Sequence, residues 1–108
     1  MEATLLSVLN VDVVAATEGP LYVRLSGDMD HRSSEAFRAG LGAVLARGRP
    51  VVVDLTGVSF LDSSGLGALL DARRRAVRLG IDLRIAGQHG AAARLMRRTG
   101  TLSMLTHG

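Results

Sequence analysis

The N-terminal part of the chain alternates between apolar and polar positions. Residues 21–25 alternate as a half-buried strand does, and the alternation ends at Gly27. A looser alternation over residues 3–14 predicts an earlier strand, and residues 17–20 between the two are typical of a turn. We therefore expect these two segments to form an antiparallel hairpin.

From residue 30 onward, stretches with a helical period are separated by short apolar runs. Asp30 is a suitable N-cap for a helix over residues 31–47, and the apolar run at 51–55 predicts a buried strand. The remaining predicted elements are a helix at 64–79, a strand at 82–86, a helix at 91–98 and a last short strand at 102–105.

Strands that alternate with helices indicate an α/β fold with a largely parallel sheet. The 108 residues suit one domain, which we place over 1–108. We expect a sandwich of about three helices on a sheet of four to five strands, mostly parallel apart from the N-terminal hairpin.

One polar segment follows the strand at 51–55 and begins the next helix. It reads Asp62-Ser63-Ser64-Gly65, and Leu66 and Gly67 follow it. A helix N-terminus has unpaired backbone N–H groups and stabilises negative charge, so a serine there can carry a phosphate without unravelling the helix. Capping by Asp62 or a serine explains one polar residue, but it does not explain a doubled serine beside two glycines.

Other polar residues follow the neighbouring strands. Asp28 and Asp30 come after the strand at 21–25, and Gln88 and His89 come after the strand at 82–86. Because the carboxyl ends of parallel strands meet at one edge of a sheet, we expect these residues to lie near the two serines. Each carboxylate also has a structural interpretation: Asp30 and Asp62 as caps, and Asp28 as a turn residue.

At these residues the chain resembles the STAS domain family, and within it the anti-sigma factor antagonists of bacteria. The matching segments are Leu-Ser-Gly-Asp-Met-Asp at 25–30, the strand and polar segment at 51–67 that end in Leu-Asp-Ser-Ser-Gly-Leu-Gly, and Ala-Ala-Arg-Leu-Met-Arg-Arg-Thr-Gly at 92–100. The family usually continues into a further C-terminal helix. This sequence stops soon after the predicted strand at 102–105, so we expect that helix to be missing and one flank of the sheet to be less covered.

The resemblance implies a phosphorylation-controlled binding protein. The unphosphorylated form would bind an anti-sigma factor and release a sigma factor, and that anti-sigma factor, typically also a serine kinase, would switch it off. A PP2C-type phosphatase would restore it. The resemblance implies Ser63 as the acceptor, and Ser64 is the alternative. The predicted partner-binding residues are Asp28, Asp30, Asp62, Ser63, Ser64, Gly65, Gln88 and His89. The alternative within the family is a scaffold or regulator of a stressosome-like or other signalling complex.

Composition narrows the remaining functions. A serine hydrolase needs a base near the serine, but the chain has only three histidines and no Gly-x-Ser-x-Gly segment, so we expect no enzyme and no catalytic residues. The sequence has no cysteine, no phosphate-binding glycine loop and no metal motif, which predicts no cofactor and no metal.

The charge and hydropathy patterns bear on partners and location. The chain has no lysine, and its net charge is only +3. The clustered arginines fall on helix faces that would be solvated, at positions 73, 74, 75, 78, 94, 97 and 98, so we expect no nucleic-acid partner. No apolar run has the roughly 20 residues of a membrane span, and no secretion leader precedes the first strand. We therefore expect a cytoplasmic protein that does not bind membranes.

Overall fold

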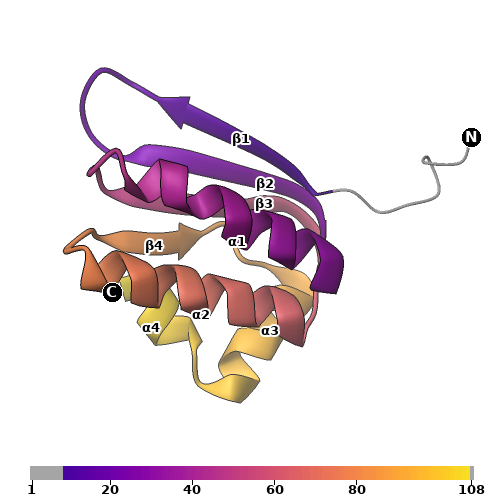
Figure 1. Ribbon diagram of the computed structural model, residues 1–108. Coiled ribbons are helices and arrows are strands. Elements are labelled where there is room, and N and C mark those ends of the chain that lie inside the picture. Colours follow the sequence, from indigo (N-terminus) through magenta and orange to yellow (C-terminus); the bar gives the residue numbers. More distant parts are fainter. Residues whose placement is uncertain (1–8, 108) are drawn as a thin grey trace, which may run out of the picture.

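The computed structural model describes residues 9–107 and arranges them as a sheet with helices packed against it (Figure 1). The elements are, in chain order, β1 (Asn10–Ala15), β2 (Leu21–Met29), α1 (His31–Leu45), β3 (Val51–Leu61), α2 (Ser63–Arg78), β4 (Leu83–Ala86), α3 (Gly90–Thr99) and α4 (Leu102–His107). This order confirms the predicted α/β fold.

The sheet has the order β1-β2-β3-β4. β1 and β2 pair antiparallel, which confirms the predicted hairpin, while β3 is parallel to both β2 and β4. Residues 3–8 of the predicted first strand lie outside the described residues, and β1 begins at Asn10. Arg49 stabilises the turn between β1 and β2: its guanidinium donates to the carbonyl oxygens of Ala16 and Gly19, each at 2.9 Å.

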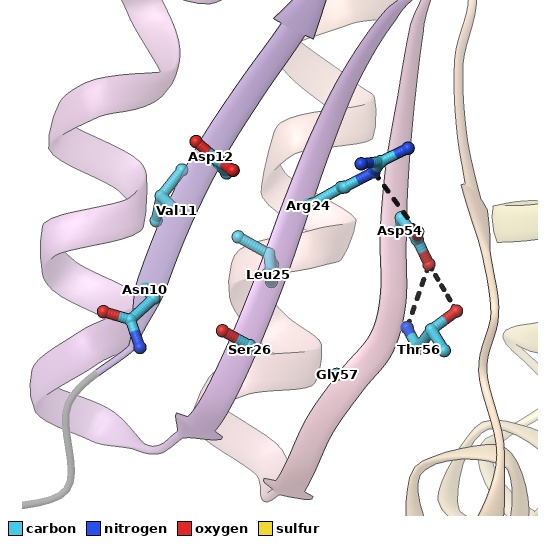
Figure 2. Close-up of a pocket in the computed structure, with 9 residues that line it drawn as sticks. All are labelled: Asn10, Val11, Asp12, Arg24, Leu25, Ser26, Asp54, Thr56 and Gly57. Carbon is cyan, nitrogen blue, oxygen red and sulfur yellow. Dashed lines mark hydrogen bonds and ion pairs between the residues drawn. The ribbon is translucent and has the colours of Figure 1, made fainter.

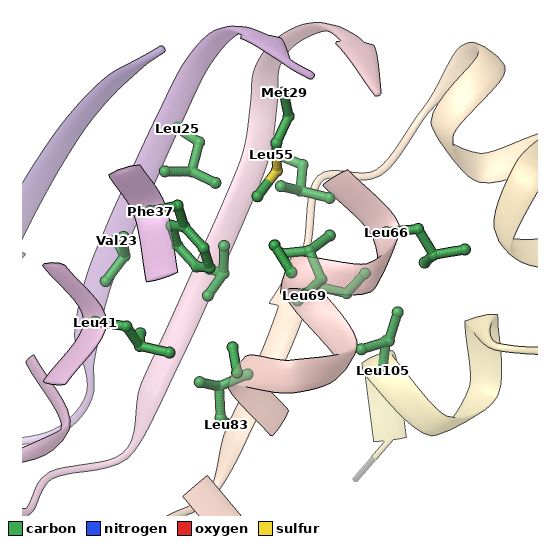
Figure 3. Close-up of a cluster of buried hydrophobic side chains, with 14 of the residues drawn as sticks. Val23, Leu25, Met29, Phe37, Leu41, Leu55, Leu66, Leu69, Leu83 and Leu105 are labelled. Atoms are coloured by element: carbon green, nitrogen blue, oxygen red, sulfur yellow. The ribbon is translucent and has the colours of Figure 1, made fainter. Parts of the chain in front are cut away.

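The hydrophobic core lies between one face of the sheet and the helices (Figure 3). Along β2, Leu21, Val23 and Leu25 are buried, and the alternating Tyr22 and Arg24 are exposed on the opposite face. α1 and α2 pack side by side over the buried face (Figure 1). The sheet therefore has one covered face and one solvent-exposed face.

β3 is longer than the strand predicted at 51–55. It runs on to Leu61, and its pairing with β2 shifts register twice, between Arg24 and Ser26 and between Gly27 and Asp28. Each shift is a bulge that adds one residue to β3. As a result the buried positions after Leu55 fall at every third residue. This part of β3 therefore lacks the alternation of buried and exposed residues by which a strand is predicted from sequence.

The C-terminal segment corrects the prediction of a last strand at 102–105. These residues belong to the helix α4, in which Leu105 is buried. The Leu105 N–H donates to the carbonyl oxygen of Thr101, the buried residue just before the helix, at 3.1 Å. α4 packs beside β4 and α2. Over residues 9–107 the sheet thus has four strands and a fourth helix follows α3, so that the flank expected to be less covered is covered.

Candidate functional site

The N-terminus of α2 exposes the two serines of the polar segment. Asp62 is the N-cap, and its carboxylate accepts a hydrogen bond from the Gly65 N–H at 3.0 Å. Ser63 is the first helical residue and is exposed, while Ser64 is half-buried. Within residues 9–107, no side-chain hydrogen bond engages either serine hydroxyl. The predicted capping role of Asp62 is confirmed, and the Ser63 hydroxyl is free to react.

Gly65 packs the N-terminus of α2 closely against the end of β2. A side chain at Gly65 would lie 2.5 Å from the carbonyl oxygen of Met29, and the same oxygen accepts from the Asp62 N–H at 3.4 Å. Gly65 is buried. The missing side chain at Gly65 therefore lets the start of α2 pack directly against the backbone of β2.

The start of α1 lies after β2 and is closed by a capping box. The Asp30 carboxylate accepts from the Ser33 N–H at 3.1 Å, and the Ser33 hydroxyl accepts from the Asp30 N–H at 2.9 Å. The Asp30 carboxylate also lies 3.0 Å from the Ser33 hydroxyl, which can donate to it. The hydrogen bonds that the carboxylate accepts from the Ser33 N–H and hydroxyl hold the pKa of Asp30 below its ordinary value of 3.8. The predicted role of Asp30 as a cap is confirmed.

We expected Asp28 to be a turn residue after the second strand, but it lies within β2. It pairs in register with Phe60 on β3, one step before Met29 pairs with Leu61. Asp28 is half-buried and Phe60 is 50% exposed. A carboxylate and an aromatic ring therefore sit side by side where the two strands end.

Gln88 and His89 lie in the segment between β4 and α3. Gly87 packs so closely on Thr56 of β3 that a side chain there would collide with the Thr56 hydroxyl. His89 is exposed, and its Nε2 donates to the Thr56 carbonyl oxygen at 3.1 Å when the proton is on that nitrogen. Gln88 is half-buried, with its Oε1 atom enclosed. Close packing at Gly87 and the hydrogen bond of His89 thus hold this segment against the bulged part of β3.

These positions share the edge of the sheet where the parallel strands end. β2 and the start of α2 are in direct contact through Met29, and a hollow of about 70 Å³ lies between the end of β3 and the start of α3. Phe60 and His89 both line this hollow. Phe60 was not among the predicted site residues. The signal was an aromatic residue, in a chain with two phenylalanines and one tyrosine, placed two positions before Asp62.

A second and larger hollow, of about 540 Å³, lies on the open face of the sheet (Figure 2). Here the Asp54 carboxylate accepts from the Thr56 hydroxyl at 2.6 Å and from the Thr56 N–H at 2.9 Å, and Arg24 lies 4.0 Å away. The hydrogen bonds from Thr56 lower the pKa of Asp54. These bonds shape the first bulge of β3, and neither serine of the α2 terminus lines this hollow.

Comparison with known protein families gives a match over most of the sequence. The model of the STAS domain matches residues 13–107, which is nearly the whole chain. The chain therefore belongs to the STAS domain family.

The relatives carry a common description. An anti-sigma F factor antagonist of Paenibacillus polymyxa is 29% identical over 89 residues, covering 81% of this chain and 76% of the relative. The crystal structure of an anti-sigma factor antagonist from Mycobacterium paratuberculosis matches with a TM-score of 0.75 and 26% identity, over 91% of this chain and 82% of that one. SpoIIAA of Bacillus, solved in its phosphorylated form, shares the fold with a TM-score of 0.70 at 21% identity, over 90% and 88% of the two chains. Within residues 9–107, the helices are all too short or too polar to cross a membrane.

Proposed function

We propose that this chain is an anti-sigma factor antagonist whose activity is switched by phosphorylation of Ser63. The observation that carries the proposal is the exposed Ser63 hydroxyl at the first position of a capped helix. Two of the relatives reported above are named as such antagonists, and SpoIIAA, which shares the fold, is described in a phosphorylated form.

Ser63 is a better acceptor than Ser64 in this geometry. Ser63 is exposed whereas Ser64 is half-buried, so a kinase reaches the first hydroxyl without moving the helix. The N–H groups of the first turn stabilise the added charge of about −1.5 to −2. Because Gly65 is packed on Met29, that turn stays in place when the phosphate is added.

The switch then acts through charge at the surface. The unphosphorylated edge offers Asp28, Phe60 and the two serines to the anti-sigma factor, with Gln88 and His89 at its flank. A phosphate beside the Asp62 carboxylate adds like charge to this edge, and burying it against a partner surface is costly. Binding is therefore lost without refolding.

The partners follow from this chemistry. The anti-sigma factor supplies the ATP-dependent serine kinase, and a PP2C-type phosphatase removes the phosphate. The chain itself is expected to catalyse neither step. It acts in the cytoplasm, where sigma factors work.

The test is incubation of the protein with its cognate anti-sigma factor and ATP, followed by phosphopeptide mapping and binding calorimetry. We expect a single phosphate on Ser63, and binding of the unmodified protein only. The Ser63→Ala variant is expected to bind and to remain unmodified. A phosphate on Ser64, Ser33 or Ser103 contradicts the assignment to Ser63, and so does autophosphorylation without the partner. Tight binding of the phosphorylated protein contradicts the switch.

A further inference from the structure

β1 forms the edge of the sheet and has one unpaired side. Its neighbour is β2, and within the described chain no strand lies beyond it. All six residues of β1 are exposed. Natural edge strands are usually protected by lysine, proline or a bulge, but β1 carries a single charged residue, Asp12, and pairs with β2 without a register shift.

An apolar groove runs beside this open edge. Val11 and Val13 pair in register with buried residues of β2, so they lie on the helix-covered face, yet they are 50% and 39% exposed. α1 covers β2 but does not reach over β1. The resulting groove has a volume of about 220 Å³ and is lined by Val11, Val13, Val23, Ala36, Phe37, Gly40, Leu41 and Val44.

We propose that a second copy of this chain pairs antiparallel with β1, so that two sheets join edge to edge into one continuous sheet. The outer backbone groups of β1 gain hydrogen-bond partners in this arrangement. The exposed valines of each copy move next to the groove of the other copy and leave water. This association is independent of the proposed function.

The sequence of β1 selects one register for this pairing. In a twofold-symmetric antiparallel pair, one residue faces its own copy. With Val13 at the centre, Val11 faces Ala15 of the second copy on the helix-covered face, and Asp12 faces Val14 on the open face. The apolar residues of the groove side are thus brought together and no charges of the same sign meet.

The neighbouring registers are worse. Centring on Asp12 places two carboxylates directly opposite one another, which is destabilising. Centring on Val14 pushes Val11 beyond the end of the second copy's β1, which stops at Ala15, and leaves that valine uncovered. β1 is therefore self-complementary about Val13.

The pairing leaves the serine edge free. β1 lies along the side of the sheet (Figure 1), whereas Ser63 is the first residue of α2 and follows the carboxyl end of β3. A dimer of this kind presents two Ser63 edges, one from each copy.

Sedimentation velocity across a wide range of protein concentrations tests the association. We expect the parent chain to dimerise, and Val13→Lys to become monomeric because two like charges would meet at the centre. Val14→Lys is expected to dimerise, since its ammonium group would face Asp12 of the second copy. Val77→Lys, which changes a 59% exposed valine on α2, is the matched control and is expected to dimerise like the parent.

Disulfide trapping tests the register, because the natural sequence has no cysteine. Mild oxidation is expected to crosslink Val13→Cys to itself, since residues opposite one another fall within the Cα separation a disulfide spans. Val11→Cys should crosslink with added Ala15→Cys and not with itself, and Val77→Cys should stay uncrosslinked.

Several outcomes would overturn the proposal. One is a parent chain that stays monomeric at every concentration. Another is a dimer that survives Val13→Lys together with crosslinking no stronger at Val13 than at Val77. A third is a chain that dimerises only after removal of residues 2–8, which would assign the groove to that segment of the same chain.

Discussion

The N-termini of α1 and α2 begin in nearly the same way and end up with different chemistry. Each is capped by an aspartate in extended conformation, with φ −102° and ψ −168° at Asp30 and φ −106° and ψ −169° at Asp62. Each carboxylate accepts a hydrogen bond from the backbone N–H three residues later. Each cap also follows directly on the end of a strand.

The difference lies in where the serine stands relative to the cap. In α1 the third helical residue is Ser33, which is only 7% exposed. Its hydroxyl accepts from the Asp30 N–H and lies 2.7 Å from the Asp28 carbonyl oxygen. In α2 the third residue is Gly65, and Ser63 stands at the first position, facing solvent. A hydroxyl at the third position completes the cap, whereas one at the first position is left available for chemistry.

The strongest test of this comparison places a charge at each serine. Ser63→Asp is expected to weaken binding to the anti-sigma factor about a thousandfold, roughly 4 kcal/mol, while thermal stability stays nearly unchanged. Ser33→Asp is expected to destabilise the fold, because it buries a carboxylate beside Asp30. Calorimetry and thermal melts of both variants measure this. If Ser63→Asp binds as tightly as the parent, charge does not control the interaction.

The two helices also differ in how closely they approach β2. Gly65→Ala should cost about 1–3 kcal/mol of unfolding free energy, since the new methyl group collides with the Met29 carbonyl and Leu61. Gly67→Ala is the matched control: its methyl group would lie 3.4 Å from the mobile end of Arg38, so helix propensity should leave it neutral or stabilising. Denaturant unfolding compares the two. Equal costs at both positions would show that the contact with Met29 carries no special weight.

Removing the two hydroxyls separates the structural serine from the available one. Ser33→Ala is expected to cost about 1–2 kcal/mol, because the capping box loses its reciprocal bond. Ser63→Ala should change stability by less than about 0.5 kcal/mol, as an exposed side chain without partners. Both values come from chemical denaturation. A larger loss at Ser63 than at Ser33 would reverse the assignment of roles.

The smallest expected effect concerns acid. The folded pKa of Asp30 lies below 3.8 because Ser33 hydrogen-bonds its charged form. A lowered pKa stabilises the fold above the unfolded value, and this contribution is lost as the pH falls through the folded value. Melting temperatures of Asp30→Asn should therefore depend less steeply on acid pH than those of the parent.

Ser33→Ala serves as the control in acid, since it keeps the Asp30 carboxylate but removes the hydroxyl that holds it. Its pH dependence should lie between those of the parent and Asp30→Asn. Parallel acid profiles for all three proteins would mean that the cap does not titrate with folding. The Asp54 pKa, lowered by Thr56, adds a contribution of the same sign in every one of them.

The caps and the shared edge could be predicted because each depends on local sequence. An aspartate before a helical period signals an N-cap, and strand–helix alternation implies that the polar segments after the strands meet. The position of Asp28 within β2, and that of Phe60 beside it, could not be predicted in this way. They depend on two register shifts against a neighbouring strand, and those shifts are set by tertiary pairing.

The C-terminal error has a similar cause. Residues 102–105 contain apolar side chains at spacings that suit a short strand or a short helix equally. Packing against β4 and α2 decides in favour of α4, where Leu105 is fully buried. Short apolar segments take their structure from the surface they cover.

The bulged half of β3 changes how much of its sequence is open to variation. An ordinary strand with one covered face commits every second residue to the core, whereas between Leu55 and Leu61 only every third residue is buried. The pairs Thr56-Gly57 and Ser59-Phe60 are exposed between them. Ser59 and Phe60, close to Ser63 in the sequence, can therefore be substituted without changing the buried residues of the core. If the proposed function holds, a cell with several related proteins can vary these two positions so that each protein recognises its own partner.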